Sequence, residues 1–234
     1  MVHVLKIWLM SFVRLIYPCR CAMCGRVLEE GEEIICMKCN MNMPRTNFHH
    51  WTDNPVERMF FGKVRLERAS SFLYYRKGSD VRNLLYKVKY KGYEELGVKM
   101  GRLIAAELSE CGFFGGMDVI VPVPLHPDRL KLRGYNQSEL IARGISEITG
   151  IPVDASSVLR IRPTETQTHK SVHERWENVN GIFCLHSPER FAGKHVLIID
   201  DVLTTGATTT ACADAFGEAE GVRISVLTMA VAGS

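Results

Sequence analysis

The sequence predicts an α/β fold, in which a parallel sheet is flanked by helices and a small metal-binding module precedes it. The second half of the chain alternates apolar, β-branched runs with segments of helical periodicity, which is typical of parallel sheets covered on both faces. Two Cys-x2-Cys pairs lie before residue 40. The length of 234 residues suits one α/β domain with a small appendage.

The composition is that of an ordinary soluble protein, with 46% hydrophobic and 24% charged residues. It excludes a fibrous repeat and long disorder. The formal charge of +3 is too small to indicate nucleic-acid binding by itself. Residues 76–102, however, contain eight Lys and Arg against three Asp and Glu, so a local basic face is expected there as an alternative to a solvated helix face.

Residues 1–18 are expected to form an amphipathic helix, because apolar residues recur there at helical spacing. A membrane span needs about 20 apolar residues, and Lys6 and Arg14 interrupt this shorter run, so no span is predicted. No small-residue cleavage site follows. Clustered cysteines without an export segment indicate a reducing compartment, and we expect a cytoplasmic protein.

Residues 19–43 are predicted to be a structural zinc module. The pairs Cys21-x2-Cys24 and Cys36-x2-Cys39 offer four thiolates to one tetrahedral ion, and four ligands leave no open position for catalysis. Gly25 fits the tight turn after the first pair. Two alternatives stay open at this point, namely that disulfides form instead, or that Cys19 replaces Cys21 as a ligand.

The polar segment 40–54 lacks periodicity and is interpreted as a linker, so the larger domain is expected to span residues 55–234. His49 and His50 are interpreted as exposed linker histidines. The scattered cysteines of the larger domain are expected to be small buried hydrophobes, and they are Cys111, Cys184 and Cys212.

The larger domain is predicted to alternate strands and helices. Strands are expected at 64–75, 118–123, 195–199 and 223–231, and helices around 81–88, 93–110, 137–148 and 207–218. Ligands of such sheets collect at the carboxyl ends of strands, which directs attention to the loops after residues 123 and 199.

The run after the strand at 195–199 carries the strongest functional pattern. Adjacent carboxylates can accept hydrogen bonds from ribose hydroxyls or bind Mg²⁺, while glycine and hydroxyl side chains at a helix N-terminus fit a phosphate. A strand end followed by a simple helix cap is the alternative, but it does not require all these parts together. The residues are Asp200, Asp201, Val202, Leu203, Thr204, Thr205, Gly206, Ala207 and Thr208. This run resembles the motif of type I phosphoribosyltransferases, which implies a ligand like phosphoribosyl pyrophosphate, with magnesium.

The loop after the strand at 118–123 is expected to face the pyrophosphate of that ligand. Arginine binds phosphate oxygens bidentately, so Arg129 and Arg133 are the candidates for this role, with Pro124, Leu125 and His126 in the same loop. Surface arginines beside a proline turn are the alternative. The polar segment 160–178 is predicted to be a mobile lid or an ordinary surface excursion, with candidate residues Thr164, Gln167, Lys170 and Arg175.

Five features in this order resemble the ComF family: the four-cysteine module, Lys89-Tyr90-Lys91-Gly92, the Pro-Val-Pro-Leu-His and Arg-Gly-Tyr-Asn-Gln run, the 164–178 segment, and Asp-Asp-Val-Leu-Thr-Thr-Gly. The resemblance covers nearly the whole chain. It implies a competence-associated protein that acts in the uptake or processing of transforming single-stranded DNA and is built on a type I phosphoribosyltransferase domain. No segment of the sequence indicates which base would accept the phosphoribosyl group.

Three functions are compatible with these residues. The first is a DNA-uptake protein that binds a phosphoribosyl pyrophosphate-like ligand and single-stranded DNA, with tyrosines such as Tyr93 and Tyr135 stacking bases and nucleic-acid contacts from Lys87, Lys89, Tyr90 and Lys91. The second is an active phosphoribosyltransferase with the catalytic candidates Asp200, Asp201, Arg129 and Arg133. The third is an adaptor that docks onto other competence proteins.

Overall fold

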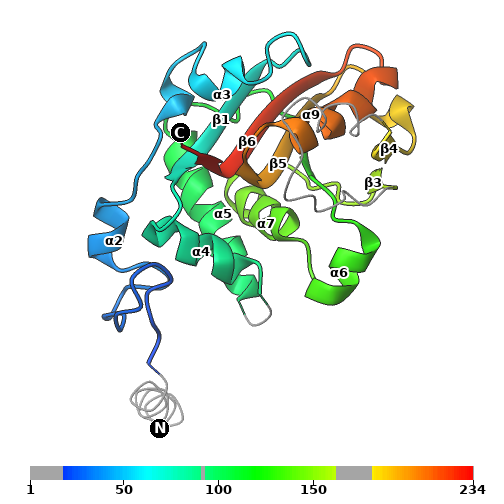
Figure 1. Cartoon of the computed structure of the whole chain (residues 1–234). Helices are drawn as coiled ribbons and strands as arrows, with labels where there is room; N and C mark the ends of the chain where they lie inside the picture. Colours follow the sequence, from blue (N-terminus) through cyan, green and yellow to red (C-terminus); the bar gives the residue numbers. More distant parts are fainter. Residues whose placement is uncertain (1–17, 91–92, 162–180, 234) are drawn as a thin grey trace, which may run out of the picture.

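A four-stranded parallel sheet forms the centre of the molecule (Figure 1). The computed structural model describes residues 18–90, 93–161 and 181–233. The strands lie in the order β1 (Arg68–Tyr75), β6 (Arg223–Ala232), β5 (His195–Leu203) and β2 (Val119–Pro122), and each neighbouring pair is parallel. The predicted fold class is confirmed.

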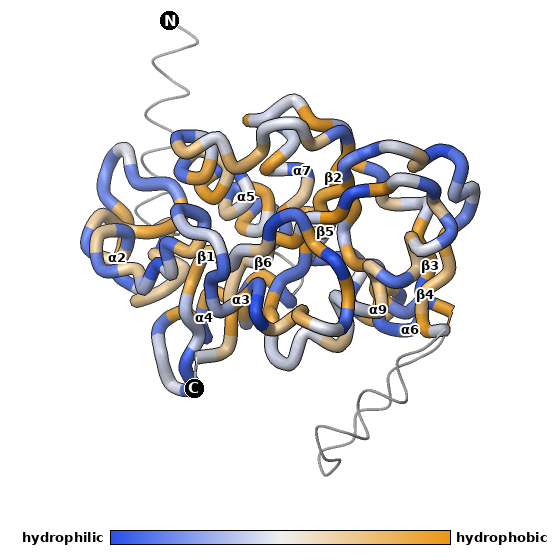
Figure 2. The backbone as a smooth tube through the Cα atoms, turned by 90° about the horizontal axis from the view of Figure 1, so that it is seen from above, coloured by the Kyte–Doolittle hydropathy of each residue, from blue (hydrophilic) through white to orange (hydrophobic). Residues whose placement is uncertain are grey.

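Side chains of β5 alternate between two separate hydrophobic cores. Leu197 and Ile199 belong to one core, which α4 (Asp80–Val88), α5 (Glu94–Ser109) and α7 (Gln137–Thr149) cover. Val196 and Ile198 belong to the other, beneath α3 (Pro55–Arg58), α9 (Ala207–Asp214) and the 3-10 helices η3 (Ala215–Glu218) and η2 (Pro188–Phe191). Because both faces of β5 are buried, its sequence is a continuous apolar run. In Figure 2 the chain at β2 is likewise hydrophobic.

Helix α6 (Pro127–Arg133) and a short antiparallel pair, β3 (Val158–Arg160) and β4 (Phe183–Leu185), complete the described elements of the larger domain. The predicted elements are all present, with one difference of functional weight. The strand expected to end at Ile199 continues to Leu203, because Asp200 pairs with Thr228 of β6 and Leu203 pairs with Val231. Asp200 and Asp201 therefore belong to the last residues of β5 and do not follow the strand.

The segment 40–54 is not a free linker, and that interpretation is wrong. Arg45 forms an antiparallel bridge with Leu73 of β1, and its guanidinium binds both carboxylate oxygens of Glu107 at 2.6 Å. The 3-10 helix η1 (Phe48–His50) follows, with Phe48 buried in the larger domain. The short helix α2 (Met37–Met41) and the cysteine module before it pack on the core beneath α4 and α5.

Helices α5 and α7 approach each other through glycines. A Cβ atom added at Gly101 would lie 2.2 Å from the carbonyl oxygen of Ile141, and one added at Gly144 would lie 2.0 Å from that of Val98. Both distances are far below contact, so the two backbones touch here. This contact positions the N-terminus of α7, which carries part of the site described below.

Among the described residues, no helix is long and apolar enough to cross a membrane. The amphipathic helix predicted for residues 1–18 lies outside the described residues except for Pro18.

Candidate functional site

A cavity of about 180 Å³ opens where β2 and β5 end. It brings together side chains from separate parts of the chain: the residue after α4, the loop after β2, α6, the start of α7, the end of β3, the end of β5 and the first turn of α9. Its lining consists of Lys89, Val123, Pro124, Leu125, Arg129, Arg133, Gln137, Ser138, Arg160, Asp200, Asp201, Val202 and Thr208. The two loops that the sequence selected thus share one cavity.

Asp200 lies deepest among the carboxylates of this cavity. Its Oδ1 accepts hydrogen bonds from the Ser138 hydroxyl at 3.1 Å and from the Asp201 backbone N–H at 2.8 Å. Burial, together with the charge of Asp201, raises the pKa of Asp200 to about 7. The folded chain therefore holds a carboxylate whose negative charge is only partly compensated.

Asp201 is held by a cation from a distant helix. The Nζ of Lys89, just beyond α4, lies 3.1 Å from its Oδ2. The two carboxylates offer hard oxygen atoms of the kind that Mg²⁺ takes, and the Lys89 ammonium occupies one of them in this structure. The sequence placed Lys89 among nucleic-acid contacts, whereas in this structure it lines the cavity.

The turn between β5 and α9 has the geometry of an anion cradle. Gly206 adopts φ 79°, which disfavours any residue with a Cβ, and it forms the N-cap of α9. Thr208 of the first turn faces the cavity. Unpaired backbone N–H groups and the positive end of the helix dipole favour a phosphate at such a position. Leu203, Thr204, Thr205 and Ala207 complete this turn without lining the cavity.

Two of the predicted residues after β2 reach the cavity from α6. Arg129 is exposed, whereas Arg133, in the last turn of α6, is half-buried. Burial lowers the pKa of Arg133 and the charge of Asp201 opposes that effect. His126 is not among the lining residues, and its Nδ1 accepts from the Asp128 backbone N–H at 3.4 Å and caps α6.

Three polar residues of the cavity lining were not among the site residues predicted from the sequence. Gln137 and Ser138 open α7 and are buried beside Asp200. Arg160 ends β3, where its guanidinium lies 5.4 Å from the centre of the Phe183 ring. Polar residues at a helix start match the ordinary pattern of capping, so nothing in the sequence separated them from caps. The predicted lid residues Thr164, Gln167, Lys170 and Arg175 lie outside the described residues.

A tyrosine-rich surface lies beside the cavity at the end of α4. The ring centres of Tyr86 and Tyr90 lie 4.1 Å apart with an angle of 32° between the ring planes, and both rings are exposed. Lys87 lies 5.9 Å from the ring centre of Tyr93, which is also exposed. Tyr135 is different, because its hydroxyl lies 2.9 Å from the Val88 carbonyl and 2.6 Å from that of Tyr90 and anchors α4 to the loop before α7. Lys91 lies outside the described residues.

The four predicted cysteines come together. Their sulfur atoms all lie within 4.8 Å of one another, and Cys19 is not part of this group. Burial opposes ionisation of the Cys36 thiol, but the backbone N–H of Cys39 and the Arg26 side chain outweigh it and lower its pKa to about 6. The thiolate is the form that binds metals. Cys21, Cys24, Cys36 and Cys39 are thus able to hold one metal ion, and none of the described cysteines forms a disulfide.

The expectation for the remaining cysteines is correct for one of three. Cys212 is buried, whereas Cys111 and Cys184 are exposed. Cys111 follows the end of α5 and Cys184 lies on the outer side of β4, and at both places the apolar neighbours in sequence point the other way.

Replacing Asp200 by Asn is expected to stabilise the ligand-free protein at pH 8. Because folding raises the pKa of Asp200 above its unfolded value, the folded state loses stability as pH rises from about 4 through 7. Asn keeps the acceptor for Ser138 and removes the charge. After allowance for solvent screening, we expect a gain of about 1–2 kcal/mol, or roughly 3–6 °C in Tm.

Thermal unfolding of both proteins at pH 4 and pH 8 checks this effect. The difference in Tm is expected to vanish at pH 4, where both side chains are neutral. An Asp200→Asn protein that is less stable than wild type at pH 8 would contradict the assigned burial of the charge.

The chain resembles known proteins in the region that builds the cavity. The model of the phosphoribosyl transferase domain matches residues 96–232, which include every lining residue except Lys89. The DNA utilization protein YhgH of Salmonella typhi is 34% identical over 128 residues, which are 53% of this chain and 56% of that relative. The matched region thus spans little more than half the length of the Salmonella relative.

Two further relatives extend the comparison. The DNA utilization protein YhgH of Escherichia coli K12 is 29% identical over 191 residues, covering 80% of this chain and 79% of that protein. Competence protein F of Haemophilus influenzae is 38% identical over 92 residues, which are 39% of this chain and 40% of that protein. With the domain match spanning more than half of its residues, the chain belongs to the phosphoribosyl transferase domain family and, within it, to the ComF family of competence-associated proteins.

Proposed function

We propose that this chain is a competence-associated protein that binds phosphoribosyl pyrophosphate, or a closely related sugar phosphate, together with Mg²⁺. One observation carries the proposal: two carboxylates, arginines from separate segments and Thr208, which follows the phosphate-type turn, line the same cavity. Each of these parts is common alone. A ligand that needs all three has vicinal hydroxyls, a monophosphate and a second, strongly anionic group.

The cavity suggests how such a ligand would lie. The turn from Thr204 to Thr208 receives the 5-phosphate, and Asp200 and Asp201 accept hydrogen bonds from the ribose hydroxyls. Arg133, from the last turn of α6, binds the pyrophosphate. Mg²⁺, when bound, supplies positive charge that offsets the two carboxylates and the pyrophosphate. Lys89 would have to leave Asp201 or move with it.

A thermal-shift experiment tests this proposal. At a concentration of about 100 times its Kd, a ligand stabilises the folded state by about 2.7 kcal/mol, so phosphoribosyl pyrophosphate with Mg²⁺ should raise Tm by roughly 5–10 °C. Ribose 5-phosphate at the same concentration should raise it less, since it lacks the pyrophosphate. Arg133→Ala is expected to reduce the difference between the two ligands.

The control for Arg133→Ala is Arg223→Ala, which removes an exposed arginine at the start of β6, at the end of the sheet away from the cavity. It should leave both shifts unchanged. Equal shifts with the two ligands in the wild-type protein would contradict a pyrophosphate subsite, and no shift with either would contradict the proposal as a whole.

We also propose that single-stranded DNA binds across the tyrosine-rich surface beside the cavity. The adjacent, exposed rings of Tyr86 and Tyr90 with Lys87 support this, because aromatic rings stack on bases and lysines contact phosphates. We expect affinity to fall as salt rises, with a slope of about −0.7 per phosphate contacted. Tyr86→Ala with Tyr90→Ala should weaken binding about 10-fold or more without changing that slope.

Fluorescence anisotropy of a labelled oligonucleotide at several salt concentrations measures both quantities. Phe61→Ala removes an exposed ring that follows α3, outside the tyrosine-rich surface, and is the matched control. An affinity that does not depend on salt would rule out the phosphate contacts, and a double tyrosine variant that binds like wild type would rule out the stacking.

For the four-cysteine cluster we propose structural Zn²⁺. Four thiolates complete a tetrahedral shell, and the cysteines pack into the core beneath α4 and α5, so the ion would hold the module in place. Metal analysis of the purified chain should find bound zinc. Only a strong chelator should remove the zinc, and its removal should unfold the cysteine module. A chain that keeps its Tm without metal would contradict this role.

A further inference from the structure

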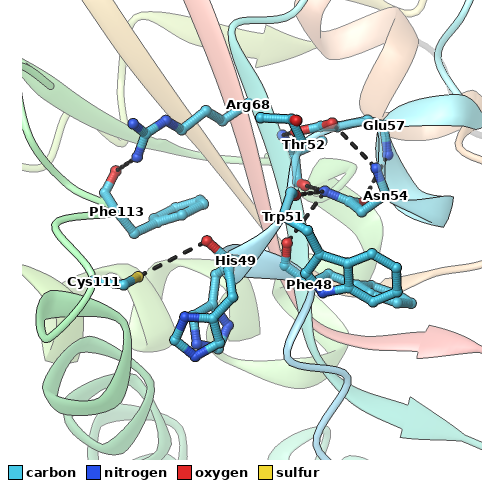
Figure 3. A pocket seen from close by; sticks show the side chains of 11 residues that line it. Phe48, His49, Trp51, Thr52, Asn54, Glu57, Arg68, Cys111 and Phe113 are labelled. Atoms are coloured by element: carbon cyan, nitrogen blue, oxygen red, sulfur yellow. Dashed lines mark hydrogen bonds between the residues drawn. The ribbon is translucent and has the colours of Figure 1, made fainter.

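A second group of metal-type ligands lies apart from the four cysteines. His49 and His50 of η1 and Cys111, just beyond α5, offer two imidazoles and one thiol whose ligand atoms all lie within 4.8 Å of one another. The two rings are 4.1 Å apart with an angle of 44° between their planes. The Cys111 sulfur also lies 3.9 Å from the His49 carbonyl oxygen (Figure 3), although 61 residues or more separate Cys111 from the two histidines in the sequence.

The backbone that presents the histidines is held by other residues. Phe48 is buried, and the Trp51 indole N–H donates to the Asn47 carbonyl at 2.7 Å and closes the turn. Asn47 itself adopts φ 57° before η1. The histidine rings are therefore not needed to build the turn that carries them. Likewise, Cys111 is exposed and contributes nothing to either core.

One buried polar atom of this group has no hydrogen-bond partner in the part of the chain that the structure describes. The Nδ1 of His49 is buried and has no hydrogen-bond partner among the described residues. A buried polar atom left unsatisfied costs about 1–3 kcal/mol. A metal ion is a partner that would remove this cost.

We propose that His49, His50 and Cys111 form a second metal site, which binds Zn²⁺ through two nitrogens and one sulfur. Imidazole and thiolate are the ligands that zinc prefers, and a hard ion such as Mg²⁺ does not take them. The ion would clip the segment that follows the cysteine module to the end of α5.

The site differs from the four-cysteine cluster in having an open position. The three ligands line a cavity of about 260 Å³ that also contains Thr52, Arg68 and Phe113. Three protein ligands leave the fourth position of a tetrahedral ion for water or a small anion. Arg68, whose guanidinium is held by the carbonyls of Gly112 and Phe113, adds positive charge to the same cavity and favours an anion there.

The zinc content of the purified full chain tests the proposal. After dialysis against buffer with a slight excess of Zn²⁺, the wild-type protein should hold two ions per chain. His50→Ala and Cys111→Ser should each hold one. Cys184→Ser removes an exposed cysteine outside both clusters and should hold two. One ion in the wild type, or two in both ligand variants, would overturn the proposal.

Alkylation gives a second readout that does not depend on variants. Mass spectrometry after brief treatment with iodoacetamide should show Cys111 protected in the presence of Zn²⁺ and modified once a mild chelator is added. Cys184 should react equally in both conditions. Reaction of Cys111 at the same rate with and without Zn²⁺ would overturn the site even if two ions were counted.

Discussion

Replacing both Asp200 and Asp201 by Ala is expected to abolish the binding of phosphoribosyl pyrophosphate with Mg²⁺. The two carboxylates are the acceptors for the ribose hydroxyls in the proposed complex, and they supply the negative charge that attracts the ion. A hydrogen bond to a charged group is worth about 1.5–3 kcal/mol, so the loss of two such bonds corresponds to a weakening of roughly 100-fold to 10,000-fold. Calorimetric titration measures this change directly.

Folding is not expected to limit this experiment. Replacing Asp200 removes a negative charge whose burial is unfavourable, as the raised pKa of Asp200 indicates. Lys89 is half-exposed, so water can hydrate its ammonium group when Asp201 is absent. Glu29→Ala with Glu30→Ala removes the same two charges from the exposed surface of the cysteine module and is the matched control. Binding by the aspartate variant within a few-fold of wild type would show that the ligand lies elsewhere.

Gly144→Ala is expected to cost about 3 kcal/mol or more of folding free energy. The added Cβ would lie 2.0 Å from the Val98 carbonyl oxygen and 2.9 Å from the Arg102 backbone nitrogen, and neither backbone atom can rotate away. Helices α5 and α7 would have to separate. Overpacking of this kind is among the few single changes with large effects on stability.

The expected fall in Tm is about 6–12 °C, measured by thermal unfolding of the ligand-free chain. Gly217→Ala is the control, because a Cβ there meets nothing within 4 Å. It should change the free energy of unfolding by about 0.5 kcal/mol or less. An unchanged Tm for Gly144→Ala would mean that the two helices pack less closely than the structure has them.

The sequence predicted the sheet because its signals are local. The apolar run of β5 reflects burial of both faces of the strand, and the periodicity of α7 reflects burial of one face of the helix. The bounds predicted for both elements differ from the observed bounds by a few residues. The end of β5 was misjudged because Asp200 and Asp201 are rare in strands. Pairing with β6 outweighs that preference, and no local pattern reveals a pairing partner.

The candidate site was predicted where its chemistry is contiguous in sequence. The run from Asp200 to Thr208 contains both a carboxylate pair and a phosphate-type turn, and its place beside Arg129 and Arg133 is as expected. Ser138 and Arg160 reach the cavity only through tertiary packing, so no spacing rule identified them. The same holds for the glycine contact of α5 and α7.

The proximity of the histidines to Cys111 was not predicted, for a related reason. A polar segment without periodicity resembles a linker, yet Arg45 and Phe48 fix this one to the sheet and to the second core. Once the segment is fixed, His49 and His50 meet Cys111, a residue that no motif connects to them. Sites assembled from distant single residues are those that a sequence alone conceals.

The crystal structure of the chain with Mg²⁺ and a non-reactive analogue of phosphoribosyl pyrophosphate tests the central claim most directly. The account predicts the 5-phosphate at the turn from Thr204 to Thr208, the ribose hydroxyls on Asp200 and Asp201, and the pyrophosphate facing Arg133. An analogue bound at another place, or a well-ordered cavity that stays empty at saturating analogue, would contradict it.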